Sequence, residues 1–114
     1  MRRIAFRENM PYYVYVIELD KKVMQSKKFL KCNPNIDTHK PCFYVGQTCR
    51  QPETRFTQHK NGYKANSFVK YYGLWLKRNI YEKLNPIHTR AEAEKTEEEL
   101  ADVLRQKGHG VWSH

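Results

Sequence analysis

Two basic side chains of this 114-residue chain are spaced so that they could act together on a phosphate. Arg55 and His59 lie four residues apart, so a helix would present both from one face. The planar arginine fork suits phosphate oxygens, and a histidine can move a proton near neutral pH. Because such pairs also occur by chance on surface helices, the spacing alone leaves a purely structural interpretation open.

A carboxylate, Glu97, is predicted within an apolar helix face. With about 100° of rotation per residue, the helix predicted after Thr89 has one largely apolar stripe, and Glu97 lies near the middle of this stripe. A carboxylate there costs several kcal/mol unless it is paired, binds a cation or takes up a proton. The alternatives are a buried ion pair, a side chain that reaches solvent past small neighbours, and a functional carboxylate. The stripe comprises Ala93, Thr96, Glu97, Leu100, Ala101, Val103 and Leu104, with Glu94, Glu98 and Asp102 on the outer face.

The helices that would position these groups have recognisable ends. Gln51-Pro52-Glu53 predicts a helix start, with proline at the first helical position, and Asn61-Gly62 ends that helix after Lys60. Thr89-Arg90-Ala91-Glu92 fits a capping box at the start of a long helix, which Gly108 stops in the left-handed conformation. A weak helix is predicted over Lys21 to Lys31, and Ser67 is predicted to cap a short one through Tyr71.

Two stretches rich in aromatic and β-branched residues predict strands. They are YYVYVIEL from Tyr12 to Leu19 and CFYVGQ from Cys42 to Gln47, and a third strand is predicted at Gly73 to Leu76. Strands interleaved with helices predict a compact α/β unit with one small sheet. Trp75 and Trp112 are expected in its core.

The charge of the chain favours a polyanionic partner. Lysine and arginine total 21 against 12 acidic residues, and the net charge is +9. Aromatic residues alternate with lysines from Lys60 to Gly73, a mixture that suits bases and phosphates, although a merely soluble basic protein would also explain the charge. No run of 18 apolar residues occurs, and the first ten residues lack a signal-peptide centre, so we expect an intracellular, cytoplasmic protein without a membrane partner.

Cysteines and one histidine offer a competing metal hypothesis. Cys32, His39, Cys42 and Cys49 are the residue types that bind zinc. Their spacing is irregular and contains no short CxxC clamp, and three cysteines are an odd number for disulfides. Free cysteines in a reducing compartment are therefore the favoured interpretation.

Taken in order, these residues resemble the hallmarks of the GIY-YIG nuclease family. The motifs are Tyr13-Val14-Tyr15, Tyr44-Val45-Gly46, Arg55 with His59, and Ala93 followed four residues later by Glu97. The similarity covers the chain from about Tyr12 to Gly110. Tyr13 stands where the family usually has glycine, whereas the second motif is well kept.

The resemblance implies a fold, an activity and a metal. The expected fold is a small mixed three-stranded sheet flanked by helices, in one domain over residues 1–114. The expected activity is DNA endonuclease chemistry, the hydrolysis of phosphodiesters with one divalent cation, Mg²⁺ or Mn²⁺. By the same resemblance Glu97 would hold the metal and Arg55 would steady the scissile phosphate. Tyr15, Tyr44 or His59 would orient or deprotonate the attacking water.

Departures from the family pattern modify these expectations. The link between Tyr15 and Tyr44 is longer than usual, so residues 21–41 look like a basic insertion. Some members carry a lysine at the position of Gln47. The residues expected to contact nucleic acid are Gln47, Lys60, Lys64 and Lys70. The alternatives are a nucleic-acid-binding module of the same fold without catalysis, and a small basic protein-interaction domain.

Overall fold

A computed structural model describes residues 11–113. The first ten residues, for which no signal peptide was predicted, lie outside this range. The first half of the chain contains strand β1 (Tyr13–Leu19), a 3₁₀ turn η1 (Lys21–Gln25), helix α2 (Lys27–Lys31), strand β2 (Cys42–Thr48) and helix α3 (Pro52–Lys60). The second half contains α4 (Ser67–Tyr72), β3 (Gly73–Leu76), α5 (Arg78–Tyr81), η2 (Glu82–Leu84), α6 (Arg90–Gln106) and β4 (Gly110–Ser113). The α/β class is confirmed.

Within residues 11–113 the sheet has four strands in the order β3-β1-β2-β4, so the prediction of three strands was wrong. β1 pairs antiparallel with both β2 and β3, whereas β4 runs parallel to β2, which makes the sheet mixed. β4 was not predicted because it is only four residues long, begins at Gly110 and follows Gly108 closely, so its sequence carries little strand pattern. Its pairing with β2 depends on a contact between distant parts of the chain.

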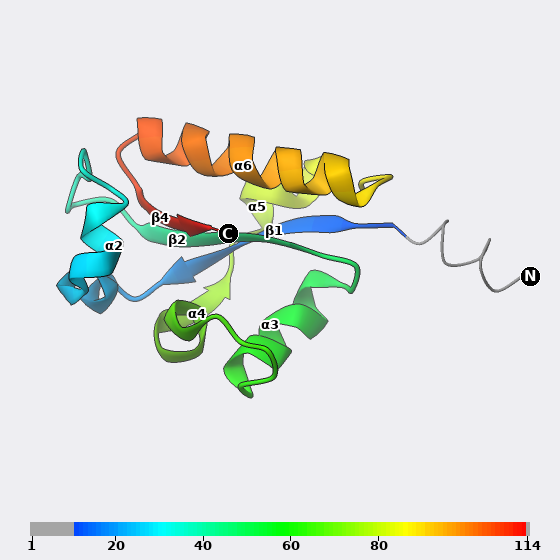
Figure 1. Ribbon diagram of the computed structural model, residues 1–114, viewed down its shortest axis with the longest axis horizontal. Coiled ribbons are helices and arrows are strands. Elements are labelled where there is room, and N and C mark those ends of the chain that lie inside the picture. Colours follow the sequence, from blue (N-terminus) through cyan, green and yellow to red (C-terminus); the bar gives the residue numbers. More distant parts are fainter. Residues whose placement is uncertain (1–10, 114) are drawn as a thin grey trace, which may run out of the picture.

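Helices cover both faces of this sheet. In Figure 1, α6 and α5 lie over one face, and α3 and α4 lie under the other. Because side chains alternate along a strand, Tyr15 and Tyr44 point to the same face. Both rings contact His59 of α3, so this is the face that α3 covers. The tyrosine rings thus belong to the layer between sheet and α3.

The segment between β1 and β2 forms two short elements instead of the single helix predicted over residues 21–31. Ser26 separates them, because its extended backbone ends η1. Its hydroxyl then accepts a hydrogen bond from the backbone N–H of Phe29 at 3.2 Å and caps α2. Phe29 is fully buried, so this segment is anchored in the main core.

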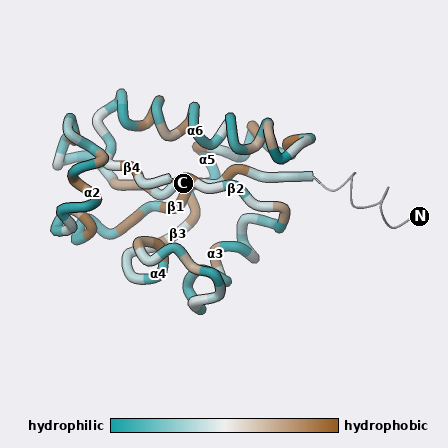
Figure 2. Tube along the Cα trace, in the orientation of Figure 1, coloured by the Kyte–Doolittle hydropathy of each residue, from teal (hydrophilic) through white to brown (hydrophobic). Residues whose placement is uncertain are grey.

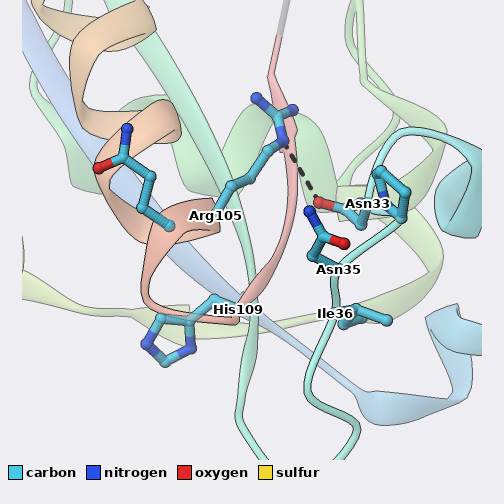
Figure 3. A pocket seen from close by; sticks show the side chains of 7 residues that line it. Asn33, Asn35, Ile36, Arg105 and His109 are labelled. Atoms are coloured by element: carbon cyan, nitrogen blue, oxygen red, sulfur yellow. Dashed lines mark hydrogen bonds between the residues drawn. The ribbon is translucent and has the colours of Figure 1, made fainter.

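Two asparagine side chains pair with strand edges that have no neighbouring strand in the described part of the chain. At the outer edge of β4, Asn33 accepts from the N–H of Val111 at 2.9 Å and donates to its carbonyl at 3.0 Å. Arg105 donates to Asn33 at 3.3 Å, beside a pocket of about 230 Å³ that Ile36 and His109 also line (Figure 3). Asn85 bonds Val14 in the same way, at 2.9 and 2.8 Å, beyond the end of β3. Both amides satisfy strand groups that would otherwise be exposed or unpaired.

The helix ends follow the sequence with one correction. α3 and α6 have the predicted starts, and Thr89 accepts from the N–H of Glu92 at 3.1 Å. Gly108 has the expected positive φ of 96°. The cap of α4, however, is Asn66 and not Ser67, because the Asn66 side chain accepts from Phe68 and Val69.

Two apolar residues predicted in the interior are exposed. Val103 is 44% exposed on α6, and Trp75 is 53% exposed on β3, an edge strand of the sheet. Trp75 donates instead to the carboxylate of Glu18 at 3.2 Å. Figure 2 shows the apolar residues concentrated on the central strands and the polar ones on the outer helices. Within residues 11–113, no helix combines the length and apolarity needed to cross a membrane.

Candidate functional site

Tyr15 and His59 form the buried centre of the site. The Tyr15 hydroxyl lies 2.9 Å from His59 Nε2, and both side chains are almost completely buried. His59 Nδ1 accepts a hydrogen bond from the backbone N–H of Asn66 at 3.1 Å. An N–H can only donate, so Nδ1 carries no proton, and Nε2 of the neutral ring must carry one. His59 therefore donates to the Tyr15 oxygen.

The ring of Tyr44 lies against the same pair. Its centroid is 6.0 Å from that of Tyr15 and 5.5 Å from that of His59. Gly46 makes this arrangement possible: a Cβ at this position would lie 2.7 Å from the Tyr15 Cζ and hydroxyl and 2.9 Å from the Tyr44 ring. The glycine of the second motif is thus required for space beside the two tyrosines.

Arg55 connects this buried centre to a surface loop. One of its guanidinium nitrogens, Nη2, donates to the Lys64 carbonyl at 2.8 Å, and Nη1 donates to the Tyr63 carbonyl at 3.2 Å and to Gln58 at 3.3 Å. Burial raises the pKa of Tyr15, and the positive charge of Arg55 opposes this rise. Arg55 and His59 therefore share one face of α3, as their spacing predicted, and both influence Tyr15.

Glu97 is buried, as the stripe predicted, and is only 5% exposed. It lines a cleft of about 490 Å³ together with Gln47, Arg90, Glu94 and Glu98. Glu94 is ion-paired with Arg90 at 3.1 Å. The two flanking glutamates are exposed, as predicted, but they share the cleft of Glu97 and are not on a separate outer face.

The charges of Arg55 and Glu97 reach both tyrosines. Burial raises the pKa of Tyr15 to about 12, the positive charge of Arg55 opposes the rise, and the negative charge of Glu97 adds to it. The pKa of Tyr44 is also raised, first by burial, then by Tyr15 and Glu97, with Arg55 again opposing. The four side chains come from four different elements, β1, β2, α3 and α6.

One end of β2 is uncovered on the side of β4 in the described part of the chain. β4 pairs with β2 from Cys42 to Val45, so Gly46 to Thr48 have no strand on that side among the described residues. Gln47 projects from this stretch into the cleft of Glu97. The cleft of Glu97 therefore borders the uncovered end of β2.

The residues predicted to contact nucleic acid lie in three different settings. Lys64 is exposed in the loop between α3 and α4, and Lys70 is exposed on α4. Gln47 lies in the cleft of Glu97. Lys60 is exposed along its chain, but its ammonium donates to the carbonyls of Lys70 at 3.0 Å and Gly73 at 2.9 Å. Its main contact is therefore the end of α4, a contact that sequence spacing could not reveal.

Other groups are outside this arrangement. Cys32, Cys42 and Cys49 are free thiols, and within residues 11–113 no group of three or more His, Cys, Asp or Glu side chains is arranged to hold a metal. Tyr13 accepts from Gln51 at 3.1 Å at the start of α3. The sequence missed Asn66, which fixes His59 through its backbone, although an asparagine before Ser-Phe is a cap signal that could have drawn attention to it.

Comparisons with protein-family models, with curated proteins and with solved structures found no match to this chain. The fold and the site together define the class, a small α/β protein with a mixed four-stranded sheet. Its buried residues include two tyrosines, a histidine and a carboxylate, and the half-buried Arg55 lies beside them.

Proposed function

We propose that this protein is a metal-dependent DNA endonuclease of the GIY-YIG type. The observation that carries the proposal is the packing of Tyr15 and Tyr44 against His59 of α3. The charges of Arg55 and of the buried Glu97 both act on these two phenols. These residues are far apart in sequence and belong to separate elements. A net charge of +9 supports a polyanionic substrate.

The donor set around Glu97 fits a hard divalent cation. The cleft is lined by the carboxylate of Glu97 and the amide of Gln47, and Mg²⁺ and Mn²⁺ prefer oxygen ligands. Glu97 would hold the cation, with water and phosphate oxygens as further ligands. When bound, such a cation supplies positive charge that stabilises the phosphate and makes water a stronger acid.

The protein's own side chains would orient the reacting groups. Both phenols are neutral at pH 7, since the pKa of each is raised, so they would act as hydrogen-bonding groups and not as bases. Arg55 places a fixed positive charge beside them, where negative charge develops on the phosphate. His59 holds the oxygen of Tyr15 by donating to it and so supports a positioning role for the histidine.

The second candidate is a nucleic-acid-binding module of the same fold without catalysis. The same basic surface would serve it. The buried carboxylate favours the nuclease, because pure binding of a polyanion gains nothing from a negative charge in the cleft.

Nicking of supercoiled plasmid, and cleavage of branched and flapped DNA, with Mg²⁺ and with EDTA, tests the proposal. We expect cleavage only with the metal. Binding without cleavage on all three substrates would favour the binding module and contradict the endonuclease. Neither binding nor cleavage would contradict both and favour a protein-interaction domain.

A further inference from the structure

Two tyrosines on the α3 side of the sheet are exposed, each beside a lysine. Tyr63 is 53% exposed and Tyr71 is 70% exposed. The ammonium of Lys64 lies 5.6 Å from the centre of the Tyr63 ring, and that of Lys70 lies 5.5 Å from the centre of the Tyr71 ring. We call these four residues the tyrosine-lysine surface. The arrangement puts a flat ring and a cation together twice.

The two pairs adjoin each other. A Cβ added at Gly62, next to Tyr63, would lie 3.3 Å from the Lys70 ammonium, so the loop after α3 touches α4 at this lysine. Lys60 strengthens the junction by donating to the Lys70 carbonyl at 3.0 Å. In Figure 1 this loop joins α3 and α4 below the sheet, on the side opposite α6.

A basic cleft connects this surface to the proposed active site. It has a volume of about 200 Å³, and Arg50, Arg55, Tyr63 and Lys64 line it together with Thr48, Cys49 and Gln58. Its described lining has three cations and no carboxylate, so it suits a phosphate. Arg55 holds the loop by its hydrogen bonds to the carbonyls of Tyr63 and Lys64, which fixes the first pair relative to the site.

The backbone conformation of Lys64 also supports a binding role for this loop. Its φ of 44° is left-handed, a conformation that glycine or asparagine adopts at lower cost. A lysine held there places its ammonium over the Tyr63 ring at the rim of the basic cleft. Local strain of this kind is common where a side chain is used in binding.

We propose that the tyrosine-lysine surface binds a single-stranded segment of the DNA substrate, with unpaired bases on Tyr63 and Tyr71 and phosphates on Lys64, Lys70 and the basic cleft. The inference rests on the proposed function and names its substrate class: DNA with a single-stranded flap or gap beside the cleavage site. Stacked bases of a duplex cannot lie on an exposed ring, whereas unpaired bases can.

Fluorescence anisotropy with labelled oligothymidylate and with a blunt duplex, in EDTA, tests the inference without cleavage. We expect the wild-type chain to bind the single strand more tightly. Tyr63→Ala with Tyr71→Ala should weaken this binding about tenfold or more, while Tyr63→Phe with Tyr71→Phe should retain it, because stacking needs the ring and not the hydroxyl. Equal binding of both DNAs, or full binding by the double alanine variant, would overturn the inference.

A lysine pair provides the electrostatic control. Lys64→Gln with Lys70→Gln should weaken binding and reduce the slope of log K against log salt by about 1.4. Lys83→Gln with Lys95→Gln removes the same charge from exposed positions on η2 and α6 and should change both much less. Equal effects of the two pairs would contradict a localised surface. If the chain cleaves DNA but shows no preference for single strands, the inference fails and the endonuclease proposal stands.

Discussion

The hydroxyl of Tyr15 lies 2.9 Å from Nε2 of His59, a buried contact between residues 44 positions apart in the chain. The backbone of Asn66 fixes the other ring nitrogen as an acceptor. His59 is therefore a donor to Tyr15, which favours a positioning role over that of general base among the roles that the sequence left open.

A double-mutant cycle on this pair should show coupling. Tyr15→Phe leaves the buried Nε2 proton without its acceptor, and His59→Phe removes the donor, so each variant should lose about 1–3 kcal/mol of unfolding free energy. The double variant should lose less than the sum, by about 1 kcal/mol, because the unmatched donor is gone. Urea denaturation measures all four proteins. Strict additivity would contradict the hydrogen bond.

The raised pKa of Tyr15 predicts a loss of stability in alkali. Its pKa rises from 10.0 to about 12 on folding, so the unfolded chain gives up this proton first as pH increases. The contribution is complete below pH 10 and is lost as pH rises through about 12, and two pKa units correspond to roughly 3 kcal/mol. Urea denaturation across this range should show a steeper fall for wild type than for Tyr15→Phe. Parallel curves would show that burial does not shift the phenol.

Gly46→Ala should displace the two tyrosines. Its Cβ would lie 2.7 Å from Tyr15, so the ring or the strand must move, at a cost of about 1–3 kcal/mol. DNA cleavage should fall, while binding of single-stranded DNA to the exposed α3–α4 loop should persist. Adding Tyr15→Leu should restore part of the stability and none of the cleavage. An alanine variant as stable and active as wild type would contradict the close packing at this glycine.

Arg55→Lys keeps the charge but removes the fork. We expect plasmid nicking to fall about 100-fold, since an ammonium cannot reach the phosphate and the loop carbonyls of Tyr63 and Lys64 together. Arg50→Lys, in the same basic cleft, is the matched control and should reduce nicking far less. If the two variants nick DNA equally well, the special role of Arg55 is wrong.

Local patterns predicted much of the fold because they act within a few residues. Proline at the start of α3 and Gly108 after α6 have conformational preferences that need no partner, and both ends were confirmed. β4 was missed because its pairing with β2 is non-local. Trp75 was misplaced because strand propensity does not distinguish an edge strand such as β3 from a central one.

Only part of the candidate site could be predicted from the sequence. The burial of Glu97 followed from helical periodicity, and it was confirmed. The contact of Lys60 with the end of α4 depends on how the loop folds back and left no pattern in the sequence. The hydrogen bond to His59 also depends on this loop, and only the cap signal at Asn66 indicated that residue.

Nicking of supercoiled plasmid by Glu97→Gln, beside binding of the same DNA, tests the central claim most directly. The substitution keeps the size of the buried side chain and removes its charge, and Glu99→Gln on the exposed surface of α6 is the control. We predict Mg²⁺-dependent nicking by wild type and by Glu99→Gln, at least about 100-fold slower nicking by Glu97→Gln, and equal binding by all three. Nicking by Glu97→Gln at the wild-type rate would contradict the account.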